Sequence, residues 1–191
     1  MSDVTLSAAL EEAYASAPAA RPIIHALSIW HDGMVDDDGQ PTEIYVYDGY
    51  HGDRYSDAGV PLMDLRLEAG ARYRGGEIVE HIAVPFDAVP PNAGSNGVAR
   101  GQLLIDGVSA EITDHLLNAI SAGVAIEVTY RAYLDGMQLD GPQNEPPLVF
   151  GLANVLIGID QVRGEIVLPN LTNKRFPGEV YRSTRFPALV R

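Results

Sequence analysis

Alternating apolar and polar residues predict two strands within residues 98–134. Ahead of a turn at Asp106-Gly107, Leu103 and Ile105 alternate with polar neighbours. After Gly123 a longer alternation predicts a second strand with two distinct faces. One face would carry Val124, Ile126, Val128, Tyr130 and Ala132, and the other Ala125, Glu127, Thr129, Arg131 and Tyr133. We expect the rest of the chain to be arranged around this stretch.

The residues between these two strands have helical spacing, from Glu111 to Ala122. The apolar stripe of this predicted helix consists of Ile112, Leu116, Leu117 and Ile120. Such a stripe is wide enough to cover one end or one face of a sheet. Gly123 is expected to end the helix.

A second helix is predicted near the N-terminus, over residues 4–17. Apolar side chains recur at every fourth position with alanines between them, and Pro18 and Pro22 follow. The recurring side chains are Leu6, Leu10 and Tyr14. We expect this helix to pack within its own domain, and packing against a neighbouring subunit is the alternative.

Shorter alternating runs predict the remaining strands, of which the first two form a hairpin and the last two a pair. These runs cover residues 22–30, 44–50, 60–67, 78–84, 148–159 and 164–168. Residues 85–97 hold three prolines and two glycines, so we expect an irregular, extended connection there. Residues 135–147 form a second proline- and glycine-rich loop, whose length favours a functional excursion.

The composition fits one globular domain, because the chain has 191 residues, of which 46% are hydrophobic and 20% charged. We expect a mainly β (α+β) fold: an antiparallel β-barrel or sandwich with the N-terminal helix and one further helix packed beside the sheet. The chain divides into an N-terminal helix or arm (1–20), a β-rich domain (21–169) and an extended basic arm (170–191). Neither a membrane span nor a signal peptide is expected.

The charge of the chain is unevenly distributed. The net charge of −13 argues against general nucleic-acid binding. Residues 163–191 hold six basic and two acidic residues, a net charge of +4, whereas the first 162 residues have a net charge of −17. A basic tail on an acidic body suits contacts between copies or with a neighbouring protein. A tail folded back on its own acidic body is the alternative.

One acidic run, Asp36-Asp37-Asp38-Gly39, has the residue types of a calcium loop. The sixth position of such a loop needs glycine, and this chain has Pro41 there. We therefore expect an exposed hairpin tip and no metal site at this run.

The histidines do not form a recognisable catalytic or metal-binding pattern. They are His25, His31, His51, His81 and His115, without HxH or HExxH spacing. His25 shares a predicted strand face with Ile23 and Leu27, which favours a satisfied core or interface histidine. Cysteine is absent, and nucleophile, phosphate-loop and dinucleotide motifs are missing. We expect neither an enzyme nor a cofactor.

The order of features along the chain resembles one family. The segments that carry the resemblance are PIIHALSIW (22–30), YRGGEIVEHIAVPFDAVPP (73–91), VARGQLLIDGVSAEITDHLLNAISAGVAIEVTYRAYLDG (98–136), PLVFGLANVLIGIDQVRGEIVLP (147–169) and FPG (176–178). With the N-terminal helix they look like a tail-tip protein family of long-tailed bacteriophages, of uncharacterised function, similar to the N-terminal part of the lambda minor tail protein L group. The resemblance rests on order, length and hydrophobic pattern over nearly the whole chain.

The resemblance implies a structural component of a phage or prophage tail tip, assembled in the host cytoplasm. Such proteins form rings, here of three or six copies, that join the tail tube or distal tail protein to the hub or central fibre protein, near the tape-measure protein. Lambda-type relatives also carry a cysteine-rich extension that binds an iron-sulfur cluster. This chain lacks cysteine, so the cluster is not carried over.

The expected working parts are therefore interfaces: the N-terminal helix, the loop 135–147 and the arm 170–191. Because arginine and aromatic residues carry most hot spots, we expect contacts from Arg175, Phe176, Arg182, Arg185 and Phe186. The alternative is a carbohydrate- or receptor-binding β-module of a phage particle. Its stacking surface would consist of Trp30, Tyr45, Tyr47, Tyr50 and Tyr55.

Overall fold

The computed structural model describes residues 5–16, 22–36, 38–49, 52–92, 100–107, 110–158 and 161–167. Over these residues the protein is mainly β, as predicted. The helices are α1 (Ala8–Ser16) and α2 (Ala110–Ala122). The strands are β1 (Thr5–Leu6), β2 (Ile23–His31), β3 (Ile44–Tyr47), β4 (Arg54–Tyr55), β5 (Pro61–Arg66), β6 (Ile78–Ala83), β7 (Phe86–Asn92), β8 (Arg100–Asp106), β9 (Ile126–Leu134), β10 (Asn144–Glu145), β11 (Leu148–Ile157) and β12 (Gln161–Val167).

Most of the described strands form one ten-stranded sheet, in the order β4-β5-β6-β3-β2-β9-β11-β12-β8-β7. Adjacent strands of this sheet are antiparallel, except that β3 and β6 run parallel to each other. The described sheet is open, with β4 at one end and β7 at the other. The expected barrel or sandwich is therefore not what these residues form. The prediction missed the parallel pair, which depends on contacts between distant segments.

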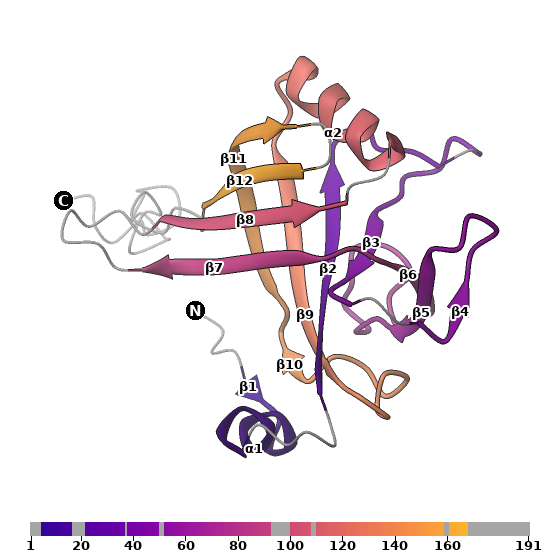
Figure 1. The fold of residues 1–191 in the computed structure, drawn as a ribbon, viewed down its shortest axis with the longest axis vertical. Coiled ribbons are helices and arrows are strands. Elements are labelled where there is room, and N and C mark those ends of the chain that lie inside the picture. Colours follow the sequence, from indigo (N-terminus) through magenta and orange to yellow (C-terminus); the bar gives the residue numbers. More distant parts are fainter. Residues whose placement is uncertain are drawn as a thin grey trace, which may run out of the picture.

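The long strands β2 and β9 run through the middle of the molecule (Figure 1). They pair over nine residues, from Ile23 opposite Leu134 to His31 opposite Ile126. The predicted alternation of β9 is confirmed: Val128 lies in the main core, while Tyr133 belongs to a separate cluster. Both faces of β9 are covered, which makes this strand the centre of the fold.

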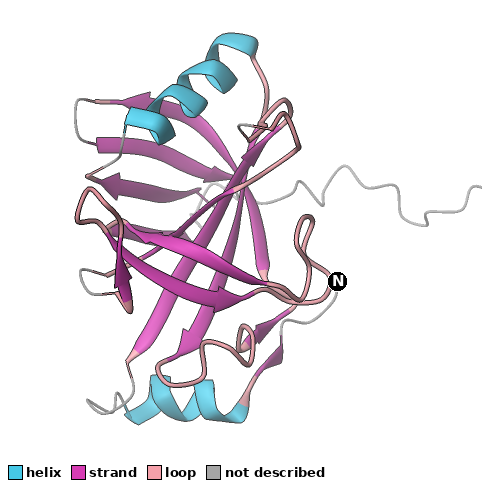
Figure 2. Ribbon diagram, turned by 90° about the vertical axis from the view of Figure 1, so that its right-hand side faces the viewer, coloured by secondary structure: helices cyan, strands magenta, loops and turns pink. Residues whose placement is uncertain are grey.

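The sheet curls, so that β7 and β8 run across β2 and β9 instead of beside them (Figures 1 and 2). The main core fills the space inside this curl. It brings Leu27 of β2 and Val128 of β9 together with Ile105 of β8 and Phe150 of β11. This curl creates the enclosed side of the sheet on which the candidate site lies.

Helix α2 connects β8 to β9 and crosses over β11 and β12, which lie between them in the sheet. Its predicted end at Gly123 is confirmed: the Gly123 N–H donates to the Ile120 carbonyl at 3.1 Å, and the Val124 N–H donates to the Ala119 carbonyl at 3.0 Å. This is a Schellman motif, and Gly123 adopts the required positive φ of 66°.

The predicted apolar stripe of α2 is only partly correct. Leu116 and Ala119 are buried against the core, whereas Leu117 and Ile120 are 45% and 43% exposed. Among the side chains of α2 that the structure describes, the buried positions are therefore three residues apart, and the side chain of Ile112 is not among those described. The prediction placed Leu117 and Ile120 on the buried face, whereas the structure leaves both of them exposed.

Helix α1 begins later than predicted, because Thr5 and Leu6 form strand β1. These residues pair with Glu145 and Asn144 of β10, which lies within the predicted loop 135–147. Leu10 is fully buried in a cluster with Ala132 and Leu134 of β9. The helix therefore packs within its own domain, as expected.

The prediction of an irregular connection over residues 85–97 was wrong for residues 86–92, which form strand β7. Residues 93–97 lie outside the described residues. Prolines remove ladder N–H groups and are tolerated only at sheet edges or bulges. Strand β7 is an edge strand, and its register with β8 shifts between Val89 and Asn92, at Pro90 and Pro91. Its outer edge is unpaired among the described strands.

Candidate functional site

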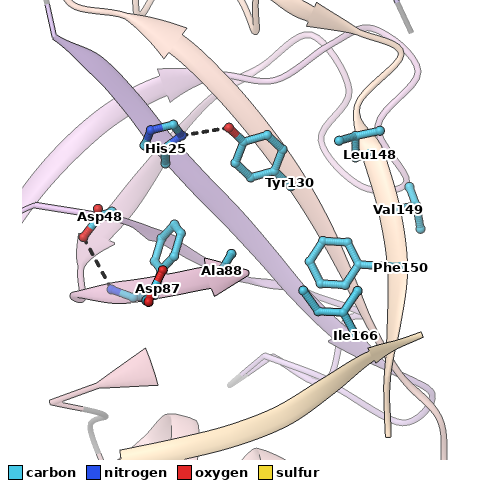
Figure 3. A pocket seen from close by; sticks show the side chains of 10 residues that line it. His25, Asp48, Asp87, Ala88, Tyr130, Leu148, Val149, Phe150 and Ile166 are labelled. Carbon is cyan, nitrogen blue, oxygen red and sulfur yellow. Dashed lines mark hydrogen bonds between the residues drawn. The ribbon is translucent and has the colours of Figure 1, made fainter. Parts of the chain in front are cut away.

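An apolar hollow of about 490 Å³ lies inside the curl of the sheet (Figure 3). This volume is in the range of ligand-binding sites. Aromatic and aliphatic side chains form most of its wall, including Phe86 of β7, Phe150 of β11 and Ile166 of β12. Its polar residues are His25, Asp48, Asp87 and Tyr130. We call this hollow the His25 pocket.

His25 and Tyr130 form the polar end of the His25 pocket. A hydrogen bond of 2.7 Å joins His25 Nδ1 to the Tyr130 hydroxyl, and the two rings stack with centroids 5.8 Å apart. The Tyr14 hydroxyl of α1 lies 3.5 Å from the Tyr130 hydroxyl. The prediction that His25 is a satisfied histidine is confirmed.

Burial sets the charge of these two groups. It lowers the pKa of His25 below its usual value, against the opposing effect of Asp48. Burial and the Tyr14 hydrogen bond raise the pKa of Tyr130. Both side chains are therefore neutral at neutral pH, and the pair offers hydrogen bonds instead of a charge.

The rim of the His25 pocket has an acidic side and an apolar side. Asp48 and Asp87 are exposed on one side, opposite Leu148 and Val149 of β11 (Figure 3). Asp48 is held in place because its Oδ1 accepts the Phe86 N–H at 3.4 Å. Leu148 and Val149 are 45% and 42% exposed. The pocket is thus suited to an apolar group with a cationic neighbour.

A second hollow, of about 510 Å³, is lined by twelve residues, of which six are charged. At its base Arg131 of β9 is 2% exposed and donates to both carboxylate oxygens of Glu68, at 2.6 and 2.8 Å. Arg131 also donates to the Ser28 hydroxyl of β2. Burial opposes the charge of Arg131, but the Glu68 carboxylate outweighs it and raises the pKa of Arg131. We call this hollow, together with the ion pairs that line it, the Arg131 network.

Arg72 closes the outer side of the Arg131 network. Its guanidinium lies 3.7 Å from the centre of the Trp30 ring and pairs with Glu127 of β9. A cation over an indole ring is attracted by the ring's negative face. Arg131, Arg72 and their carboxylate partners are thus engaged with each other, which fits a structural role. The buried Oε2 atom of Glu43, which also lines the hollow, has no hydrogen-bond partner among the described residues.

The buried charges of the Arg131 network were not predicted. Alternation placed Arg131 on the second face of β9, the one with Glu127 and Thr129. An arginine on such a face is ordinarily expected to be exposed to water. Its partner Glu68 lies 63 positions earlier, and no spacing pattern links the two. Only the pairing of β9 with β2 and the fold of residues 67–77 bring them together.

The acidic run forms a hairpin tip, as expected. The Asp36 carboxylate accepts the N–H groups of Asp38 and Gln40, and Val35 bridges to Pro41. Asp37 lies outside the described residues. Within the described ranges, no group of three or more His, Asp and Glu side chains is arranged to hold a metal ion.

The tyrosine stacking surface of the alternative prediction is not formed. Tyr45 and Tyr47 are 7% and 1% exposed, and they belong to different buried clusters. Tyr55 is exposed, Trp30 is covered by Arg72, and Tyr50 is not among the described residues. Strand alternation could not reveal that both faces of β3 are covered.

The predicted contact residues of the arm, Arg175, Phe176, Arg182, Arg185 and Phe186, all lie outside the described residues. Their role stays a prediction. Neither described helix has the length and apolarity needed to cross a membrane.

A protein-family model, described as Domain of unknown function (DUF1833), matches residues 60–181. The match begins just before β5, includes β7, β11 and β12 of the His25 pocket, and extends into the arm. No curated protein matches the chain.

Proposed function

The chain belongs to the family described as Domain of unknown function (DUF1833), and we propose that it is a structural component of a long-tailed bacteriophage or prophage tail tip. In this proposal it forms a ring of three or six copies, which connects the tail tube to the hub or central fibre protein. The tape-measure protein would be a neighbour during assembly. The order of sequence features that resembles tail-tip proteins supports this assignment.

Exposed apolar side chains carry the proposal. Val89 of β7, Leu148, Val149 and Leu156 of β11, and Val167 of β12 are 42 to 70% exposed. They come from the half of the sheet that includes the His25 pocket. Exposed apolar groups that gather on one part of a protein mark an interaction site. A subunit interface would remove them from water.

The open sheet also supports assembly. The outer edges of β4 and β7 have no partner strand in the described sheet, and β7 is the longer of the two. An unpaired edge accepts a strand from another chain, and on β7 residues 86–89, ahead of Pro90 and Pro91, offer such an edge. Strand pairing between subunits would close the ring and produce the barrel-like, tail-tube-like arrangement that one subunit lacks.

The negative charge suits a channel that passes DNA. The chain has a net charge of −13, and an acidic lumen would repel phosphate. We propose that the acidic body lines this lumen. A ring structure in which the carboxylates face outward would contradict this point.

Native mass spectrometry of the purified full chain, with electron microscopy of the same sample, tests the ring. We expect a mass of three or six times 20.6 kDa and closed rings with matching symmetry. A chain that stays single at every concentration up to its solubility limit contradicts the proposal.

A matched pair of variants locates the interface. Val149 and Ile78 are both 42% exposed, but Ile78 lies on β6 in the other half of the sheet. We expect Val149→Lys to prevent ring formation and Ile78→Lys to leave it intact. Equal effects of both substitutions would place the interface elsewhere.

A further inference from the structure

The arm contains the tripeptide Arg-Phe-Pro twice, at residues 175–177 and 185–187. Both copies of the motif lie outside the described residues, whereas the His25 pocket consists of described residues. Building on the proposed ring, we propose that the His25 pocket binds the motif Arg185-Phe186-Pro187 of a second copy of this chain. The arm of one subunit would then link it to a neighbouring subunit.

The apolar wall of the pocket suits the phenylalanine of the motif. The ring would lie among Phe150, Ile166 and Tyr130, whose side chains converge on the hollow (Figure 3). An apolar cavity of about 150 Å³ is sufficient for benzene. The pocket, at about 490 Å³, therefore has room for the phenyl ring and for the proline that follows it.

The acidic rim suits the arginine of the motif. Asp48 and Asp87 lie exposed beside the apolar hollow, and burial keeps the pKa of His25 low, so no cation of the pocket opposes an incoming guanidinium. Arginine pairs with carboxylates through several parallel hydrogen bonds. A phenylalanine in the hollow would leave the preceding arginine at the rim, next to these carboxylates.

The proline of the motif lowers the conformational entropy that is lost on binding. A residue that precedes proline is held in an extended conformation. A peptide that is already extended loses less conformational entropy on binding. The exposed side chain of Leu148, on the same face of β11 as Phe150, extends the apolar surface at the rim, where the rest of the arm would continue.

Geometry and charge favour the arm of a second copy as the occupant. The arm leaves the described structure at Val167, next to the pocket residue Ile166. From Val167 to Arg185 the chain reaches about 60 Å when extended, enough to cross to a neighbouring subunit. The net charge of +4 over residues 163–191 attracts this segment to another acidic body.

Disulfide cross-linking of the full chain tests the proposal, because introduced cysteines are the only thiols present. Leu148→Cys places one thiol at the pocket rim, on the face of β11 that also carries Phe150, and Ala188→Cys places the other just after the motif. Under mild oxidation we expect covalent ladders of two or more chains on a non-reducing gel. Phe186→Ala in the same background should lower the cross-linked yield about tenfold, the effect of losing roughly one buried aromatic contact.

The control pairs Ala188→Cys with Leu139→Cys, because Leu139 is 51% exposed but lies outside the pocket. This pair should give no ladder. A disulfide confined to single chains would overturn the assignment to a second copy. If the double-cysteine chain assembles into rings but forms no disulfide between chains on oxidation, the pocket assignment is overturned and the proposed function stands. Single chains at every concentration would overturn both.

Discussion

His81 shows at the level of one residue how burial fixes a charge state. Its side chain is 0% exposed, and its Nδ1–H donates to the Val79 carbonyl at 2.9 Å. Its Nε2 is buried with no hydrogen-bond partner among the described residues. Burial lowers the pKa of His81 to about 4, and the positive charge of Arg131 adds to this effect. A second proton would have no acceptor, so His81 stays neutral in the folded protein.

This burial predicts a pH-dependent stability. In the unfolded chain the pKa of His81 returns to about 6.5. Between these two pKa values the unfolded state binds more protons, so the free energy of unfolding falls as the pH falls from about 6.5 towards 4. We expect His81 to contribute a loss of about 1 to 3 kcal/mol.

Urea unfolding at about pH 7 and about pH 4.5 measures this effect in the natural chain and in His81→Asn. The asparagine amide retains a donor for Val79 but does not titrate. The variant should lose less stability on acidification than the natural chain. Equal losses in both proteins would show that His81 is not responsible.

The pair of Arg131 and Glu68 gives a second prediction at the residue scale. Arg131 is 2% and the Glu68 side chain 12% exposed, and two hydrogen bonds join them. Removing one partner leaves the other charge buried without compensation. We expect Arg131→Met and Glu68→Leu each to cost about 3 to 5 kcal/mol of unfolding free energy, and the double variant to cost clearly less than their sum.

A double-mutant cycle by chemical denaturation checks this coupling. The exposed pair of Arg74 and Glu77 provides the control, because both side chains are more than half exposed. Its coupling energy should be below about 1 kcal/mol. Additive losses at Arg131 and Glu68 would mean that the two charges do not depend on each other.

At the scale of elements, local patterns predicted what depends on local physics. The alternation of β9, the helix α2 and its end at Gly123 were predicted, because each follows from spacing within one segment. Strand β7 was missed because its prolines are tolerated only at an edge, and the edge position is a property of the whole sheet. The exposure of Leu117 and Ile120 was missed for the same reason, since the neighbours of α2 decide it.

Gly123 allows a direct test of the helix end. Its φ is 66°, and a Cβ at this position would meet no atom within 4 Å. Gly123→Ala should therefore destabilise the protein through backbone strain alone, by about 1 to 2 kcal/mol. Thermal or chemical denaturation measures this loss, and Ser121→Ala, at an exposed position of α2, should change stability by less than about 0.5 kcal/mol. No difference between the two variants would contradict the capping role.

At the scale of the whole molecule, the candidate site is a product of the curled sheet. The His25 pocket joins residues as distant in sequence as His25 and Ile166, and four of its strands, β2, β9, β11 and β12, lie side by side in the sheet. Sequence analysis identified His25 as a satisfied residue but gave no sign of a pocket. Sequence spacing cannot report such a site, because β7 faces β2 only after the sheet has curled.

We propose that this chain forms a ring at the tip of a phage tail, and intact particles test that proposal most directly. Cryo-electron microscopy of tailed particles from the source of this sequence should show three or six copies in a closed ring between the tail tube and the central fibre. Density for each arm should then lie over the His25 pocket of a neighbouring copy. Particles whose tails contain no copy of this chain would contradict the account.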